Sequence, residues 1–184
     1  MIPPTTGGKI ILPKEKKIVA IGEIGLDYHY EGTDKQKQQI FFEKQLSLAE
    51  ELNMPVIIHD REAHGDCFET VLRYPNVKGV FHSYSGSAEM AHELTKRGWY
   101  ISFSGTVTFT NAARVREAAS AVPRNKLLIE TDAPYLAPHP MRGKLNHSGY
   151  LTFVVNTLSQ IWGCSPQEAA EQTYQNATTF FNLP

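Results

Sequence analysis

The stretch IVAIGEIGL at residues 18–26 decides the fold of this chain. It is short, nearly all apolar and rich in β-branched residues, which is typical of a strand covered on both faces. Four more apolar stretches follow it, and they are expected to be strands at residues 56–59, 77–83, 99–104 and 127–132. Helical patterns separate the stretches, and such a regular alternation predicts a parallel sheet.

The first helical pattern opens with Thr33 and Gln36 at the spacing of a capping box. Its Phe41, Leu48 and Leu52 form one apolar stripe that should face the sheet. Further helices are expected between the later strands, and two more close the chain after a long loop. The expected positions before that loop are 33–53, 63–74, 87–97 and 112–122, and the loop itself covers 133–148.

Two of these helices carry further signals. In the second helix Cys67, Val71 and Leu72 should lie on the inner side. The last helix should begin at Ser165, because Glu168 completes a capping box with it.

The spacing of the strands favours a barrel over an open doubly wound sheet. Four strand-to-strand steps separate Glu23 from Asp132, at about 27 residues a step, close to the roughly 30 of a right-handed βαβ unit. A complete barrel has eight strands and about 250 residues. The prediction is therefore an α/β fold, a partial TIM-type (β/α) barrel of five parallel strands with outer helices. It occupies residues 18–184, the last five-eighths of a barrel, behind a loose leader at 1–17.

The composition limits the kinds of substrate and cellular compartment that fit this chain. The 184 residues carry 18 Lys and Arg against 19 Asp and Glu, which argues against a polycationic surface for nucleic acid. A phosphate-bearing substrate would then need a bound metal for much of its positive charge. Cys67 and Cys164 form no metal-type pair, which is consistent with a reducing cytoplasm. A membrane span of about 18 apolar residues and a secretory signal are both missing from the sequence.

Ligand-type residues stand at the ends of four of the five apolar runs: Glu23, His59, His82 and Asp132. Parallel strands bring their carboxyl ends to one rim, which is where α/β barrels place their chemistry. A single His or Glu at a strand end is more often an exposed loop residue or a structural group. Four together favour a metal site, because imidazoles and carboxylates suit Zn, Mn or Ni and a carboxylate can bridge two ions.

These segments resemble the TatD-like metal-dependent deoxyribonucleases of the amidohydrolase superfamily. The motifs that carry the resemblance occur in order and at sensible spacing. They are GEIGLDYHY at 22–30, PVIIHDRE at 55–62, FHSYSG at 81–86, ETDAPYLAP at 130–138 and RGKLN at 142–146.

The resemblance implies a hydrolase that uses two divalent metal ions (Zn, Mn, Mg or Ni) to cut DNA phosphodiester bonds. Glu23 would bridge the two ions, while His59 and His82 would bind one of them. Asp132 would bind the other ion and act as the catalytic residue that helps to activate water.

One departure from the family is large. The family begins with an H-x-H on its first strand, and this sequence contains no H-x-H. One tightly held ion is therefore expected rather than two. Two alternatives stay open: a truncated, non-catalytic remnant, and a half-barrel whose metal site another chain completes. The open sheet edges would then favour a homo-oligomer or a complementing chain.

Candidate substrate contacts lie on the same rim. Arg61 follows His59 and could pair with a phosphate, or else form a surface ion pair with Glu62 or Asp66. In the long loop, Arg142, Lys144 and Asn146 are expected to grip substrate phosphate, an expectation that the family resemblance supports.

The first strand is followed on this rim by Asp27, Tyr28 and Tyr30. Exposed aromatic rings can stack on splayed bases. Packing of the loop over the barrel mouth is the alternative.

Overall fold

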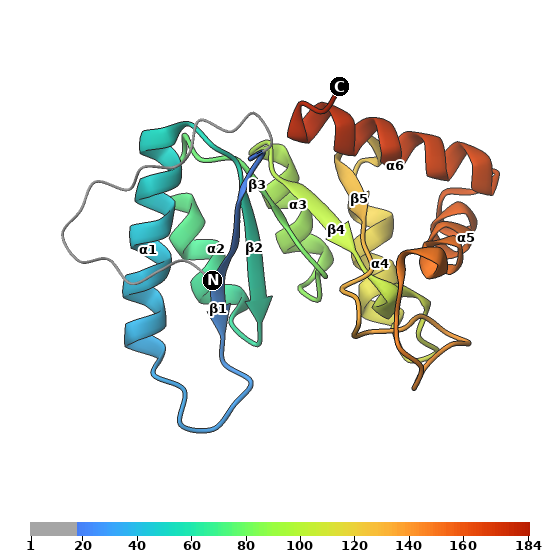
Figure 1. The fold of residues 1–184 in the computed structure, drawn as a ribbon, viewed down its shortest axis with the longest axis horizontal. Coiled ribbons are helices and arrows are strands. Elements are labelled where there is room, and N and C mark those ends of the chain that lie inside the picture. Colours follow the sequence, from blue (N-terminus) through green and yellow to red (C-terminus); the bar gives the residue numbers. More distant parts are fainter. Residues whose placement is uncertain (1–17) are drawn as a thin grey trace.

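The computed structural model describes residues 18–184, and the predicted leader at 1–17 lies outside them. Five strands form one sheet in the order β1-β2-β3-β4-β5, and every neighbouring pair is parallel (Figure 1). The prediction of an α/β fold with five parallel strands in chain order is confirmed. The strands are β1 (Ile21–Asp27), β2 (Val56–Arg61), β3 (Gly79–Phe81), β4 (Tyr100–Phe103) and β5 (Leu127–Ile129).

One helix connects each strand to the next, and two more follow β5. Three short 3₁₀ turns, η1 (Gly105–Thr108), η2 (Arg124–Lys126) and η3 (Ser148–Tyr150), complete the structure. In residues 18–184 no helix is both long enough and apolar enough to cross a membrane. The helices are α1 (Lys35–Leu52), α2 (His64–Leu72), α3 (Ala88–Lys96), α4 (Ala113–Ala121), α5 (Leu151–Trp162) and α6 (Pro166–Phe181).

The core lies between the sheet and the helices that connect its strands. Alternate side chains of a strand point to opposite faces, so Phe81 and Ile101 enter this core while Val80 and Tyr100 face the other way. The last turns of α6 cover that second face at the beginnings of the strands, where Phe180 packs on Tyr100 with ring centroids 4.6 Å apart. The carboxyl ends of the strands stay free of this cover (Figure 1).

Helix α1 differs from its prediction by one residue in two respects, its N-cap and its buried phenylalanine. Asp34, not Thr33, is the N-cap, and its side chain accepts a hydrogen bond from the Lys37 amide. The fully buried aromatic is Phe42, whereas Phe41 is 52% exposed. Leu48 and Leu52 do pack against the core, as predicted. Two adjacent phenylalanines both fit a helical stripe, and only contact with the sheet selects one of them.

The other helices follow their predictions more closely. Cys67 and Val71 are buried in α2, but Leu72 is 36% exposed, which corrects its assignment to the inner side. Helix α6 begins as predicted: the Ser165 side chain accepts from the Glu168 amide, and Glu168 reaches back to the Ser165 amide.

Candidate metal centre

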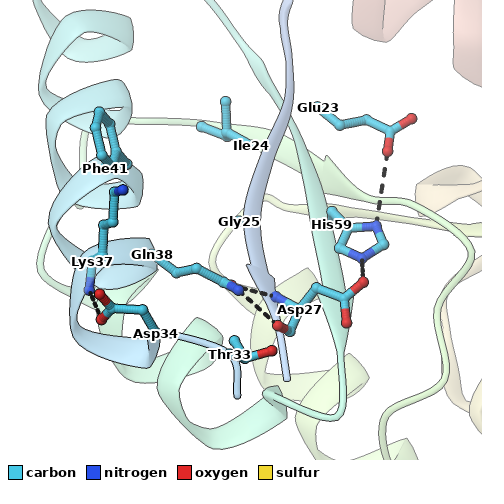
Figure 2. Close-up of a pocket in the computed structure, with 10 residues that line it drawn as sticks. All are labelled: Glu23, Ile24, Gly25, Asp27, Thr33, Asp34, Lys37, Gln38, Phe41 and His59. Carbon is cyan, nitrogen blue, oxygen red and sulfur yellow. Dashed lines mark hydrogen bonds and ion pairs between the residues drawn. The ribbon is translucent and has the colours of Figure 1, made fainter. Parts of the chain in front are cut away.

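Strand β1 carries Glu23 in its interior rather than at its end. Glu23 is the third residue of β1, which continues to Asp27, and the pairing with β2 shifts between Ile21 and Ile24. Glu23 and Asp27 therefore lie on the His59 side of the strand, while Ile24 points into the core beside α1 (Figure 2). The sequence-based placement of Glu23 at a strand end is wrong, but its side chain still reaches the expected rim.

Three ligand atoms converge on one point. His59 Nδ1 lies 3.1 Å from His82 Nε2. Glu23 Oε2 lies 3.2 Å from His82 Nε2 and 3.8 Å from His59 Nδ1. In a tetrahedral site with metal–ligand bonds of about 2.0–2.1 Å, ligand atoms are separated by about 3.3 Å. Two imidazoles and a carboxylate at this spacing could together hold a single divalent cation.

Charge around His82 also favours a cation. Only 10% of the His82 side chain is exposed, and burial alone would lower its pKa. The hydrogen bond to Glu130 and the negative charges of Glu130 and Glu23 outweigh burial and raise the pKa of His82 above its usual value. The centre is thus electronegative although the whole chain is almost neutral.

Asp132 lines the same cavity as Glu23, His59 and His82, a space of about 590 Å³. It lies three residues beyond β5, and its backbone has a positive φ of 58°, a conformation that Asp tolerates better than most residues. Burial raises the pKa of Asp132, and the charges of Glu130 and Glu23 act in the same direction against the effect of His82. The structure therefore brings all four predicted ligands together, and their role as ligands remains a prediction.

Two carboxylates beside the histidines received no metal-site role in the sequence analysis. Asp27 Oδ2 lies 3.2 Å from His59 Nε2, and Glu130 Oε1 lies 3.0 Å from His82 Nδ1. Burial alone would raise the pKa of Asp27, but hydrogen bonds from the His29 amide and from His59 outweigh it and lower that pKa. Their positions in the sequence could have indicated this role. Asp27 directly follows the apolar run of its strand, and Glu130 stands two residues before Asp132.

Arg61 is placed where it could meet a substrate. It lines the cavity, its guanidinium lies 5.5 Å from the centre of the Tyr30 ring, and its nearest carboxylate is Asp27 at 4.0 Å. The alternative ion pairs with Glu62 or Asp66 are not formed.

Those two acids are engaged elsewhere. Glu62 contacts His29 Nδ1 at 2.6 Å, and Asp66 accepts from the Tyr28 hydroxyl at 2.7 Å. Tyr28 is thus held in the structure, whereas Tyr30 is 65% exposed beside the cavity.

The long loop after β5 uses Asn146 internally. Asn146 is 6% exposed, and its amide nitrogen donates to the carbonyls of Thr131 at 2.6 Å and Tyr135 at 2.7 Å. Both amide hydrogens are used within the loop, which argues against the prediction that Asn146 grips phosphate. Arg142 and Lys144 are exposed but do not line the cavity, and Arg142 lies over the Phe109 ring at 4.2 Å.

Comparison with known proteins identifies a matching family. A family described as "TatD related DNase" matches residues 9–182. The chain is 42% identical over 175 residues to the uncharacterized metal-dependent hydrolase YabD of Bacillus subtilis (strain 168), covering 94% of this chain and 68% of the relative. It is 37% identical over 180 residues to the protein named 3'-5' ssDNA/RNA exonuclease TatD of Pantoea vagans (strain C9-1), covering 94% and 69%.

Solved structures give the same result. The crystal structure of YJJV, a TatD homologue from Escherichia coli K12, superposes with a TM-score of 0.86 at 32% identity, covering 92% of this chain and 66% of that one. The chain spans about two thirds of the length of the proteins it matches. The predicted resemblance is confirmed, and we conclude that the chain belongs to the family of TatD-related DNases.

Proposed function

We propose that this chain is a metal-dependent hydrolase that cleaves phosphodiester bonds of DNA. The observation that carries the proposal is the convergence of Glu23, His59 and His82, whose ligand atoms lie 3.1–3.8 Å apart in a cavity that Asp132 also lines. The names of the relatives support it, because they include metal-dependent hydrolases and an exonuclease that acts on single-stranded DNA and RNA.

The residues of the cavity have distinct roles in this proposal. Glu23, His59 and His82 would hold a divalent ion, for which their donor set suits Zn, Mn or Ni. When bound, that ion supplies Lewis acidity, which polarises a phosphoryl oxygen and lowers the pKa of water. The Asp132 carboxylate accepts a proton from the attacking water, and Arg61 pairs with a substrate phosphate from the cavity wall.

We further propose one tightly held ion per chain. The three converging residues supply the usual number of protein ligands for a catalytic zinc site. A second ion would have Asp132 and the shared Glu23, since the sequence lacks the H-x-H that serves it in the family. Its affinity is expected to be weak.

The free cysteines and the sheet edges support proposals about the cellular compartment and about association. Cys67 and Cys164 are both free thiols, which is consistent with a reducing cytoplasm. Self-association, or pairing with a complementing chain, would use the outer edges of β1 and β5, each of which has a single strand neighbour in residues 18–184.

The first prediction tests the function through metal content and cleavage together. Elemental analysis of the purified chain should find about one divalent ion. His82→Ala should lose it, because two remaining ligands cannot hold the geometry. Asp132→Asn should keep the ion but abolish cleavage of a labelled oligonucleotide in excess Mn²⁺ or Mg²⁺, because the proton acceptor is gone.

The exposed His92 of α3 provides a matched control, and His92→Ala should behave as the unchanged chain does. Two tightly bound ions, or robust cleavage by Asp132→Asn, would contradict the proposed division of roles. Metal binding without any cleavage by the unchanged chain would favour the non-catalytic alternative.

A further inference from the structure

Each imidazole of the metal centre lies between the converging ligand atoms and a second carboxylate. His59 turns Nδ1 toward the centre and Nε2 toward Asp27, at 3.2 Å from Oδ2. His82 does the reverse, with Nε2 toward the centre and Nδ1 toward Glu130, at 3.0 Å from Oε1. The two rings therefore present opposite nitrogens to the same point.

These contacts constrain where the ring protons lie. A cation binds only a bare ring nitrogen and an ionised carboxylate only accepts hydrogen bonds, so with a cation in the centre the proton of each ring lies on the nitrogen that faces Asp27 or Glu130. A neutral imidazole holds one proton, so His59 Nδ1 and His82 Nε2 are left with bare lone pairs. These atoms are 3.1 Å apart with Glu23 beside them, an arrangement of three acceptors that a cation would satisfy.

We propose that Asp27 and Glu130 are positioning residues that hold the two histidines in opposite tautomers, so that His59 offers Nδ1 and His82 offers Nε2 to one divalent cation. This inference rests on the metal site of the proposed function. Carboxylates that accept the second N–H of a ligating histidine orient the ring and raise its basicity.

The orientation of Asp27 is fixed by three hydrogen bonds, two with Gln38 and one with His29. Gln38 of α1 clamps its backbone: the Asp27 amide donates to Gln38 Oε1 at 2.7 Å, and Gln38 Nε2 donates to the Asp27 carbonyl at 2.8 Å (Figure 2). The His29 amide donates to Oδ1 at 3.0 Å, which leaves Oδ2 for His59. The side-chain amide of Gln38 thus makes the hydrogen bonds to the Asp27 N–H and C=O that a neighbouring strand would otherwise make.

Glu130 is fixed by the sheet. Its amide donates to the Phe103 carbonyl at 3.2 Å, which continues the pairing of β4 and β5 one residue beyond the end of β5. Its side chain is 22% exposed and meets the nearly buried ring of His82. Neither carboxylate has to become ordered when the cation binds.

The proposal is tested on the metal-free and Zn²⁺-loaded full chain. Zn²⁺ affinity is measured by competition with a chromophoric chelator, and the ring protons are located by ¹⁵N-edited NMR of the histidines. In the Zn²⁺-loaded chain the proton should lie on Nε2 of His59 and on Nδ1 of His82. Asp27→Asn and Glu130→Gln preserve shape and remove charge, so each should weaken Zn²⁺ binding about 10- to 100-fold. The N–H resonance of the facing histidine should also move upfield.

Glu93→Gln is the control, because Glu93 is an exposed carboxylate that pairs with Lys96 on α3 and contacts no residue of the centre. It should leave Zn²⁺ affinity unchanged. Protons on the opposite ring nitrogens of the unchanged chain would overturn the proposal, as would wild-type Zn²⁺ affinity in both Asp27→Asn and Glu130→Gln.

His82→Ala separates the two failures. If it binds Zn²⁺ like the unchanged chain, the metal site itself is wrong and the positioning roles fall with it. If it loses Zn²⁺ while Asp27→Asn and Glu130→Gln do not, only the positioning proposal fails. Should Glu130→Gln not fold, Asp27→Asn and the ring protons of the unchanged chain decide.

Discussion

Gly25 shows at the scale of one residue how closely the backbone approaches at the candidate site. It pairs with His59 across β1 and β2, and a Cβ added to it would lie 2.0 Å from the His59 carbonyl oxygen. Its φ is +141°, a conformation that side chains rarely adopt. The absence of a side chain therefore allows β1 to lie directly against the strand segment that carries His59.

We predict that Gly25→Ala destabilises the chain by at least about 2 kcal/mol, since the unfavourable φ and the clash each cost about 1–3 kcal/mol. Displacement of His59 should also weaken Zn²⁺ binding. Urea unfolding and metal analysis measure the two effects. Gly65→Ala in α2 is the control, because a Cβ there meets nothing within 4 Å. Equal stability and metal content in the two variants would refute the close-approach argument.

Helix α1 shows at the scale of an element how packing chooses one face. Phe42, Leu46 and Ala49 are its buried residues, at spacings of four and three. The same face presents Gln38, four residues before Phe42, to the end of β1. One face of α1 therefore packs its apolar side chains into the core and also positions Asp27 beside the metal centre.

The adjacent phenylalanines of α1 give a direct comparison. Phe42→Ala should destabilise the chain by about 3–5 kcal/mol, because it empties a fully buried site. Phe41→Ala should change stability by less than about 0.5 kcal/mol, as for other surface positions. Urea denaturation at low protein concentration measures both. The opposite ranking would mean that Phe41 faces the sheet, as the sequence pattern suggested.

For the whole molecule, the outer edge of β1 is the feature from which we expect association with another chain. In residues 18–184 this strand pairs with β2 alone. A hollow runs between this edge and α1, lined in part by Ile24, Gln38 and Phe41 (Figure 2). Ile40 and Phe41 expose 46% and 52% of their surface nearby. Unpaired strand edges beside apolar side chains favour association with another chain.

We therefore predict concentration-dependent self-association in sedimentation velocity. Phe41→Glu should shift the distribution toward the monomer, because it places a charge in the hollow. Tyr174→Glu, at an even more exposed aromatic on α6, should not. A monomer of 20.6 kDa at all concentrations, with no binding of a dye that reports apolar surface, would contradict the prediction.

Much of the fold and most residues of the candidate site follow from local sequence. Apolar runs and capping residues predict the strands, the helices and their parallel order, because the side-chain period of each element is set by its own backbone. Parallel order alone then places Glu23, His59, His82 and Asp132 on one rim, as observed. The sequence by itself thus determined the class of the fold, the residues of the candidate centre and the resemblance to the family.

Tertiary structure decided the details that the chemistry depends on. Asp27 meets His59 across 32 residues, and Glu130 meets His82 across 48. The choice of Phe42 over Phe41, the position of Glu23 within β1 and the internal use of Asn146 are settled in the same way. These contacts depend on the register between strands and on how helices and loops pack against them. Register and packing are relations between distant segments, so no local pattern in the sequence encodes them.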